Sequence, residues 1–586
     1  MKTQILVISC AMLGAFATGV AEGKKTDMDA IRGRLVAEQI EKSPRDEEYL
    51  TGLVNAQKED GTWGDVDYET KRRSGWPVSR HVDRLVHLAR AYAHPDSKLH
   101  DDRKTLAAVR NALAAWVRMD LESVNWWHNQ IGVPTSIAAV LLLTGDELPA
   151  DLRSDATKIL ARSRECRHRT GQNLVWVSRV TLAEGVLREK PELVRKAVGD
   201  ILSTVKETGK EGIQADASFH QHGNQLYSGG YGRGFLDDVT ATVAIVRGTK
   251  FAADPKQVKL LTRLLLDGHQ WMVYREHFDP GARGREISRR GSDRSGRSLL
   301  EPAQRLLRLD GREKELERLI ARLKQCRIPS DGRREKGIAP LAGNRHFWNS
   351  DFMVHRGRDR QYAGDWYMSV KMHSTRTLAT ESGNGEALKN WYVGCGTMTI
   401  MNDHQTYRNI WLLLDWRKLP GTTIEQSDRP LPEPTWTGGT RGKHEFVGGV
   451  SDGVYGAAAY THDRDGVKAY KAWFFVDDVA VCLGAGIEAD GNAPVVTTID
   501  QAYLHGEPAY GTDDVAKTLE EPYAIPDETK WVTNGRVGYM LLEEGTLKLD
   551  ISKKSGKWQE INRSAPASWA ESAEVMTLTI DHGVKP

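Results

Sequence analysis

The chain has 586 residues, which is too long for a single hydrophobic core, so two or more domains are expected. Its 81 Lys and Arg residues are balanced by 79 Asp and Glu residues. This balance excludes a global charge that would attract a polyanion, and no nucleic-acid partner is expected. Hydrophobic residues make up 40% of the chain, as in ordinary globular proteins.

The N-terminus has the pattern of a secretion signal. Lys2 precedes an apolar run, Ile5–Val20, that ends among small residues. This predicts a signal peptide over residues 1–23 and a secreted or periplasmic protein. A lipoprotein cleavage box at 7–10 is the alternative. No later segment is long and apolar enough to span a membrane. The cysteines after the signal are widely spaced and form no CxxC pair; they are Cys166, Cys326, Cys395 and Cys482.

The first half of the chain has a helical pattern. Apolar residues recur at helical spacing from about Asp27 to Arg327. Many helices joined by long loops predict a layered or ring-like helical domain over residues 24–335. The predicted helices are 82–92, 106–117, Thr135–Leu143, Leu174–Leu187, Pro191–Val205, Leu236–Val246, Gln257–Tyr274 and Glu313–Leu323.

The second half has a strand pattern. A polar segment, Arg327–Asn349, is expected to lead into a second domain over residues 345–586, where the apolar period changes from about 3.6 to 2. Asp477 and Asp478 separate two predicted strands and indicate a hairpin. Helices followed by stacked antiparallel sheets give an α+β multidomain fold. The predicted strands are 366–372, Ala472–Val476, Val479–Leu483, Val495–Leu504, Val537–Leu542 and Val575–Ile580.

One glycine-rich stretch stands out from the helical pattern around it. Residues 216–238, DASFHQHGNQLYSGGYGRGFLDD, place His220, His222, Tyr227 and Tyr231 among five glycines. Glycine at this density builds a loop whose backbone can approach a ligand closely. Imidazoles and phenols on such a loop can exchange protons with a substrate. The alternative is a turn in which these side chains only satisfy local hydrogen bonds.

This stretch resembles the His/Tyr loop of polysaccharide lyase family eight, which comprises the hyaluronate, chondroitin AC and xanthan lyases. The order and spacing of the further similar segments make the resemblance specific, and it runs from about Asp60 almost to Pro586. These segments are DGTWGDVDY at 60–68, NWWHNQIGVP at 125–134, TGQN at 170–173, GREISR at 284–289, STRTLATESGNGE at 374–386, WRKLPGTT at 416–423, KAWFFVDDVAVCLGAGI at 471–487 and TTIDQ at 497–501.

Two features depart from the family pattern. Ala387 follows the NGE segment where family members usually have Asn, which bears on a calcium-binding or loop-ordering contact. The chain also stops at LTIDHGVKP, where related proteins usually continue with further strands. We therefore expect an abbreviated last sheet or an incomplete chain.

The resemblance implies an N-terminal incomplete α/α toroid followed by C-terminal antiparallel β-sandwich sheets. It also implies an exported monomeric enzyme that cleaves a uronate-containing glycosaminoglycan, similar to chondroitin or hyaluronan, by β-elimination. The products would carry 4,5-unsaturated uronate ends. Xanthan is an alternative substrate, and a glycoside hydrolase on an α/α toroid is an alternative activity. No cofactor and no catalytic metal are expected, whereas a structural calcium ion is left open.

The resemblance also assigns the proton-transfer residues. Asn173 would neutralise the uronate carboxylate, although from its position it could instead be a helix N-cap. Tyr231 would take the C5 proton and protonate the leaving oxygen, for which neighbouring cations should lower the phenol pKa. His222 would accept the proton itself or position the carboxylate and Tyr231, with His220 as its competitor.

The remaining assignments concern charge and sugar binding. Arg285 and Arg289 share a face if their segment is helical, and they would stabilise the ionised phenol and hold a carboxylate or sulfate. The nearby run Arg283, Arg290, Arg294 and Arg297 could instead be a solvated basic surface. Glu381 would orient His222, Tyr231 or an arginine, with Asn384 beside it. Trp126 and Trp127 would stack on sugars, although at least one of two adjacent helical residues is expected in the core.

Overall fold

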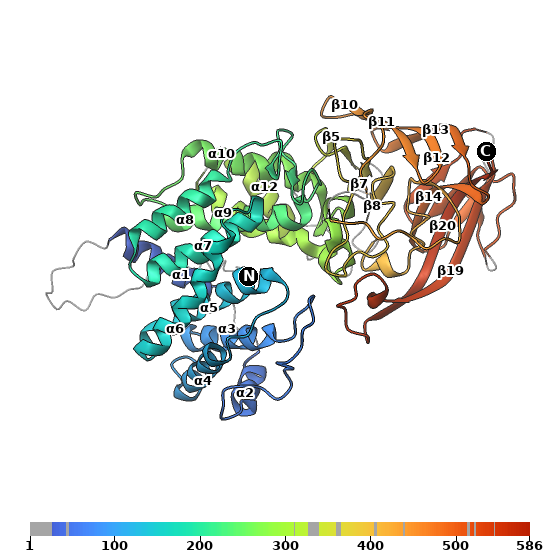
Figure 1. Cartoon of the computed structure of the whole chain (residues 1–586). Helices are drawn as coiled ribbons and strands as arrows, with labels where there is room; N and C mark the ends of the chain where they lie inside the picture. Colours follow the sequence, from blue (N-terminus) through green and yellow to red (C-terminus); the bar gives the residue numbers. More distant parts are fainter. Residues whose placement is uncertain are drawn as a thin grey trace, which may run out of the picture.

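The computed structural model describes residues 26–42, 46–309, 311–325, 339–358, 365–402, 407–436, 440–512, 516–520, 523–543 and 545–586. The predicted signal peptide over 1–23 and Cys326 lie outside these residues. Within them, helices occupy the first half of the chain and strands the second, and the two halves lie side by side (Figure 1). No helix of the described part is both long and apolar enough to cross a membrane.

The helices form an incomplete α/α toroid, in which neighbours along the chain pack against one another. Buried faces of α3, α4, α5 and α6 form one apolar cluster that includes Trp63, Trp76 and Trp116. The α-helices are α1 (Asp27–Ile40), α2 (Glu47–Ala56), α3 (Ser79–Ala93), α4 (Arg103–Met119), α5 (Val133–Thr144), α6 (Ala150–Leu160), α7 (Gly171–Leu187), α8 (Pro191–Ser203), α9 (Arg233–Val246), α10 (Pro255–Arg263), α11 (Leu300–Leu307) and α12 (Glu313–Lys324).

The helix expected over Gln257–Tyr274 is wrong, because the segment breaks into pieces. Helix α10 ends at Arg263, a π-turn covers Leu264–Gly268, and a 3₁₀ turn leads into a short strand, β3 (Val273–Tyr274). At the break, a Cβ on Gly268 would lie only 2.0 Å from the Ala217 carbonyl oxygen. The central loop therefore approaches the backbone too closely for a continuous helix with side chains.

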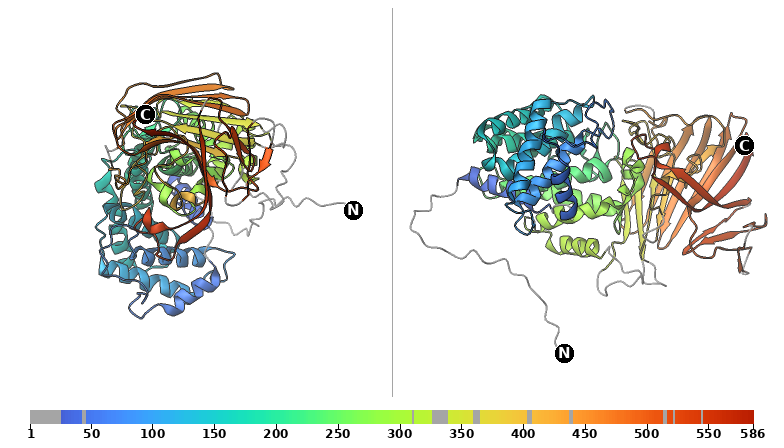
Figure 2. Two further views of the ribbon diagram at one scale, coloured as in Figure 1. Left: turned by 90° about the vertical axis from the view of Figure 1, so that its right-hand side faces the viewer. Right: turned by 90° about the horizontal axis from the view of Figure 1, so that it is seen from below.

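The second half consists of four-stranded antiparallel sheets, which Figure 2 shows following one another away from the helices. Their orders are β5-β6-β7-β8, β10-β11-β12-β13, β19-β20-β14-β9 and β16-β15-β17-β18. The strands are β5 (Gly343–Phe347), β6 (Phe352–Arg358), β7 (Asp365–Lys371), β8 (Thr397–Met401), β9 (Thr423–Glu425), β10 (Val447–Ser451), β11 (Gly456–Arg464), β12 (Val467–Val476), β13 (Val479–Ala489), β14 (Pro494–Tyr503), β15 (Ala509–Gly511), β16 (Ala516–Thr518), β17 (Trp531–Asn534), β18 (Val537–Met540), β19 (Leu547–Lys557) and β20 (Ala570–Val584).

Of two sequence predictions for this half, the hairpin is confirmed and the linker boundary is wrong. The hairpin is found, because β12 ends at Val476 and β13 begins at Val479, with Asp477 in the left-handed region at φ 50°. The linker predicted over Arg327–Asn349 extends too far, because β5 already starts at Gly343. Residues 326–338 of that linker lie outside the described part.

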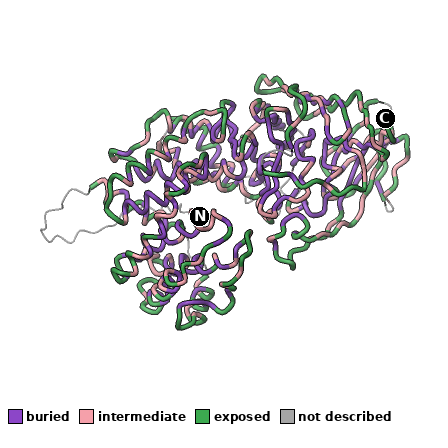
Figure 3. Tube along the Cα trace, in the orientation of Figure 1, coloured by how far each residue is buried: buried purple, intermediate pink, exposed green. Residues whose placement is uncertain are grey.

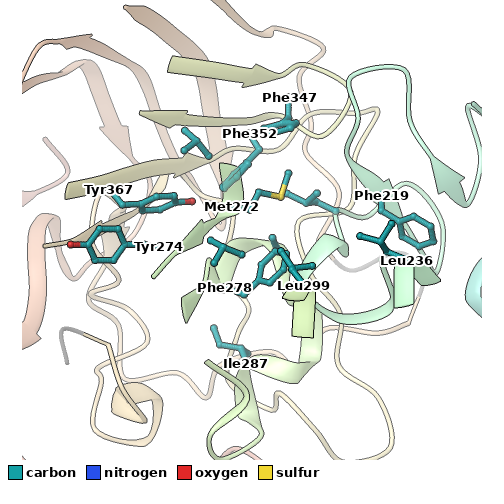
Figure 4. Packing of buried hydrophobic residues seen from close by; sticks show 14 of the residues in the cluster. Phe219, Leu236, Met272, Tyr274, Phe278, Ile287, Leu299, Phe347, Phe352 and Tyr367 are labelled. Atoms are coloured by element: carbon teal, nitrogen blue, oxygen red, sulfur yellow. The ribbon is translucent and has the colours of Figure 1, made fainter. Parts of the chain in front are cut away.

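A single apolar core joins the two halves. Phe219, Phe278 and Leu299 come from the helical half, and they belong to one cluster with Phe347 and Phe352 of the first sheet (Figure 4). Burial is continuous across this junction in Figure 3. Close packing fixes the positions of core residues. Because this core spans both halves, side chains from both halves can be held in one fixed site.

Polar contacts reinforce the same junction. The Tyr367 hydroxyl donates to Asp279 Oδ2 over 2.8 Å, and the Asn349 backbone N–H donates to Asp216 Oδ2 over 2.7 Å. Domains that move relative to one another usually share a small, polar interface. The shared apolar core and buried hydrogen bonds found here resist such hinge motion.

Candidate active site

The central loop folds into two close turns before helix α9. A short strand, β2 (Phe219–His220), is followed by His222 in the left-handed region at φ 58°, and a π-turn covers Ser228–Gly232. A Cβ on Gly230 would lie 2.5 Å from the Tyr227 ring. Glycine there lets the rings of Tyr227 and Tyr231 pack edge to face, with centroids 5.0 Å apart.

The two histidines of the loop have different surroundings. His220 is buried, its Nε2 lies 2.8 Å from Ser350 Oγ at the junction of the halves, and burial lowers its pKa to about 3. It is therefore a neutral structural residue. His222 lies on the wall of a cleft, with its ring 4.8 Å from the ring of Tyr231. The structure thus brings His222, and not His220, to the site.

Glu381 connects the strand half to this loop. Its carboxylate is fully buried and lies 2.8 Å from His222 Nδ1, and it accepts a hydrogen bond from the Tyr227 hydroxyl over 3.1 Å. It also pairs with Arg285. Burial favours the neutral acid, but the bonds from His222 and Arg285 prevail and lower the pKa of Glu381. An ionised carboxylate only accepts hydrogen bonds, so Nδ1 of His222 carries a proton.

The two arginines meet on a second carboxylate. They lie on a 3₁₀ helix, Gly284–Ser288, and its end, rather than on an α-helix. Arg285 Nε donates to Glu386 Oε2 over 2.9 Å, and Arg289 Nε donates to Glu386 Oε1 over 2.6 Å. Arg285 is buried and paired. In the nearby arginine run, Arg283 is buried, so the alternative of a solvated basic surface is wrong for it, whereas the arginines at 290, 294 and 297 are exposed. Arg289 is partly exposed.

Tyr231 does not have the lowered pKa that the sequence predicted. Its hydroxyl accepts a hydrogen bond from Arg285 Nη2 over 3.0 Å, and the Arg285 charge favours the phenolate. Burial is the larger effect, however, and it raises the pKa of Tyr231 above its ordinary value of 10.0. The phenol is therefore protonated at neutral pH in the substrate-free site.

Asn173 faces the cleft from the first turn of helix α7. The N-cap of α7 is Thr170, so the alternative of Asn173 as an N-cap is wrong. Asn173 is buried, and its Oδ1 has no hydrogen-bond partner among the described residues. Glu211 joins this turn to the central loop. Its carboxylate accepts a hydrogen bond from the Thr170 hydroxyl and another from the Gly223 N–H over 3.0 Å.

The cleft has a volume of about 750 Å³ and is lined by both halves of the chain. Trp126 and Trp127 both line it, so neither is withdrawn into the core. The Arg169 guanidinium lies over the Trp126 ring at 4.3 Å, and Trp127 packs edge to face on Trp176. Indole rings with a guanidinium held over one of them form a surface suited to an acidic sugar chain.

Asn384 also lines the cleft, from a tight turn of the strand half. It has φ 55°, and the Ala387 that follows in the same turn has φ 58°. The backbone N–H of Ala387 donates to Ser288 Oγ over 3.0 Å, so this hydrogen bond orders the loop without an asparagine side chain. Among the described residues, no group of three or more His, Cys, Asp or Glu could hold a metal ion.

Sequence reasoning missed several cleft residues. Glu386 stands two residues after Asn384 and could have been found from the same motif. Trp436 had no local signal, because it lies in a loop far along the chain, yet its ring centroid is 4.8 Å from the Arg285 guanidinium. Trp176 looked like an ordinary residue of a helix, although its ring lies 5.7 Å from that of Tyr231.

Comparisons with known proteins agree with this geometry. The model of the polysaccharide lyase family 8 N-terminal α-helical domain matches residues 20–324, and the model of the family 8 super-sandwich domain matches residues 342–586. A chondroitinase-AC of Pedobacter heparinus is 29% identical over 99% of this chain and 80% of its own length. A hyaluronate lyase of Thermasporomyces composti is 28% identical over 96% of this chain and 75% of its own length.

A xanthan lyase of a Bacillus species is 25% identical over 91% of this chain and 62% of its own length. Among solved structures, a chondroitinase AC lyase studied with oligosaccharides superposes with a TM-score of 0.86. That structure is 28% identical to this chain, and the match covers 96% of this chain and 81% of the solved chain.

Proposed function

The chain belongs to polysaccharide lyase family 8 and is an enzyme that cleaves polysaccharides, and we propose that its substrate is a uronate-containing glycosaminoglycan. The observation that carries the proposal is the convergence of Asn173, His222, Tyr231 and Arg285 on one cleft. The chondroitinase-AC and hyaluronate lyase relatives favour chondroitin or hyaluronan. Xanthan is the second candidate, because a xanthan lyase matches most of the chain.

The reaction removes the C5 proton of the uronate and expels the oxygen on C4, so that a C4=C5 double bond forms. Asn173 lines the cleft, and in the proposed mechanism its amide stabilises the carboxylate as it takes up charge from C5. Tyr231 carries the proton: it takes it from C5 and returns it to the leaving oxygen as a hydroxyl. Arg285, which already donates to the Tyr231 hydroxyl, stabilises the phenolate that is present before the C5 proton is taken and again after the proton is returned.

The raised pKa of Tyr231 adds one requirement, since a protonated phenol is not a base. In the proposed mechanism His222 accepts the phenol proton first: its Nδ1 is bound to Glu381, which leaves Nε2 as the accepting nitrogen, and its ring lies 4.8 Å from the ring of Tyr231. In the alternative assignment, Nε2 of His222 takes the C5 proton directly and Tyr231 serves only as the acid. A substrate whose leaving group needs no protonation separates the two, because Tyr231→Phe would still cleave it only under the alternative.

Hydrolysis fits the site poorly. It needs one carboxyl as acid and a second as base or nucleophile on either side of the bond. The cleft carboxylates are already committed: Glu386 binds both Arg285 and Arg289, and Glu211 binds the Gly223 N–H. Glu286 lies 3.1 Å from Arg289 Nη1.

The direct test is digestion of chondroitin and hyaluronan with continuous ultraviolet detection. Elimination creates a conjugated double bond that absorbs in the ultraviolet, whereas hydrolysis creates new reducing ends without that absorbance. We expect absorbance and reducing ends to rise together. New reducing ends without absorbance would contradict the proposal.

We also propose that the protein is exported and acts as a monomer. The support for export is the charged and apolar pattern of residues 1–23. N-terminal sequencing of secreted protein should find a start between residues 18 and 24, and a retained Met1 would contradict the proposal. Sedimentation of the purified protein tests the monomer.

A further inference from the structure

The cleft continues past Trp436 into a second hollow of about 710 Å³. Arg73, Ser74, Asn384, Trp436 and Ser564 line both hollows, so the two form one continuous groove. A chain bound at the reacting centre can therefore extend beyond Trp436 without leaving the protein surface.

The second hollow is lined by both halves of the chain. Residues 72–74, between α2 and α3, line it from the helical half, and residues 382–385, 433–436 and 563–564 line it from the strand half. Loops of the two halves nearly touch, because a Cβ on Gly75 would lie 3.4 Å from Ser564 Cβ. A ligand in this hollow would contact both halves.

The arginines at the reacting centre and those of the second hollow differ in how far carboxylates neutralise them. At the reacting centre, Arg285 and Arg289 are paired with Glu381, Glu386 and Glu286. In the second hollow, Arg563 is paired with Glu433 over 3.0 Å. Arg72 and Arg73 line it as well, are exposed, and form no salt bridge within the described residues. The unneutralised charge of the second hollow is therefore positive.

We propose that Arg72 and Arg73 form a second anion subsite, which binds a negatively charged group of the polymer beyond Trp436 from the bond that is cleaved. This inference rests on the proposed function. The group is a sulfate ester or the carboxylate of a further uronate, since guanidinium forks bind both by paired hydrogen bonds. The subsite makes Arg72 and Arg73 residues that determine substrate affinity and take no part in the chemistry.

The test compares the wild type with the double variant Arg72→Gln/Arg73→Gln, which keeps most of each side chain but removes its charge. Two exposed ion pairs contribute about 0.2–1 kcal/mol each, so KM should rise roughly twofold to thirtyfold while kcat stays within about twofold. Salt should weaken substrate binding by the wild type more than by the variant, because exposed charges are screened. The control is Arg103→Gln/Lys104→Gln, an exposed basic pair at the start of α4 that lies outside both hollows.

Two substrates identify the group that is bound. A rise in KM on chondroitin sulfate alone assigns the subsite to sulfate, because hyaluronan has no sulfate esters. A rise on both polymers assigns it to a uronate carboxylate. An unchanged KM on both, or an equal effect in the control, overturns the subsite. Wild-type protein that gives no unsaturated product from any uronate polymer would instead refute the proposed function.

Discussion

Replacing Tyr231 by Phe isolates the proton carrier from the rest of the site. The ring can keep its edge-to-face contacts with Tyr227 and His222, and only the hydroxyl is lost. Within the described residues that hydroxyl has one hydrogen bond, from Arg285 Nη2, and Arg285 retains Glu381 and Glu386 as partners. Tyr231→Phe should therefore fold normally and bind substrate with nearly unchanged affinity.

The expected loss of turnover is large. Removing a general acid–base group lowers kcat about 10²–10⁴-fold, which corresponds to about 2.7–5.4 kcal/mol in the activation barrier. The matched control is Tyr227→Phe in the same loop. The Tyr227 hydroxyl is buried, donates to Glu381, and accepts from the Arg285 backbone N–H over 3.1 Å. Its loss leaves that N–H unsatisfied and should reduce the free energy of unfolding by about 1–3 kcal/mol.

The assay pairs kcat from ultraviolet absorbance with the thermal midpoint of each variant. Tyr231→Phe should lose turnover and keep its midpoint, whereas Tyr227→Phe should lower its midpoint and keep more of its turnover. The opposite pattern, with near-normal kcat in Tyr231→Phe and none in Tyr227→Phe, would show that Tyr231 is structural and that the wrong phenol was assigned.

Three further predictions concern charge. Asn173→Ala should lower kcat more than it raises KM. Chondroitin whose carboxyl groups have been reduced should resist cleavage by the wild type. Efficient cleavage of this reduced polymer would refute the role of the carboxylate. Because the folded pKa of Glu381 lies below its ordinary 4.5, its charge contributes stability above that pH, and this is lost as the pH falls further. Glu381→Gln should therefore reduce the free energy of unfolding at pH 7 by about 3–5 kcal/mol, which lowers the thermal midpoint. The midpoint of this variant should also fall less than that of the wild type as the pH is lowered. The exposed Glu301→Gln is the control and should show neither effect. A chelator should leave kcat unchanged; loss of kcat in folded protein, restored by a metal ion, would contradict catalysis without metal.

Local signals in the sequence predicted the loop and several of the elements. The glycines of the central loop mark close approaches that the structure contains, as Gly230 against Tyr227 shows. The adjacent aspartates at 477 and 478 interrupt two apolar strands and so predicted the hairpin turn that the structure contains. In each case a few neighbouring residues decide the backbone conformation, so one sequence carries the information.

Contacts between distant segments were beyond such signals. His222 and Glu381 are 159 positions apart, and only the family resemblance suggested that they meet. Trp436 was missed for the same reason. The pKa of Tyr231 was predicted in the wrong direction because the sequence shows the nearby arginine but not the burial that outweighs it. Likewise, the break at Gly268 depends on the approach of Ala217 from another segment.

The distribution of charge explains how one cleft could both bind a polyanion and act on it. If the arginines at the reacting centre were free, they would bind the ground-state carboxylate strongly, and binding that is equal in the ground and transition states does not raise kcat. Here Arg285 and Arg289 are offset by buried carboxylates before a substrate arrives. On the proposed assignment, the Asn173 amide then acts most strongly when the carboxylate takes up charge in the transition state. On the proposed subsite, further affinity for the polymer comes from Arg72 and Arg73 in the second hollow, which form no salt bridge within the described residues and take no part in the reaction.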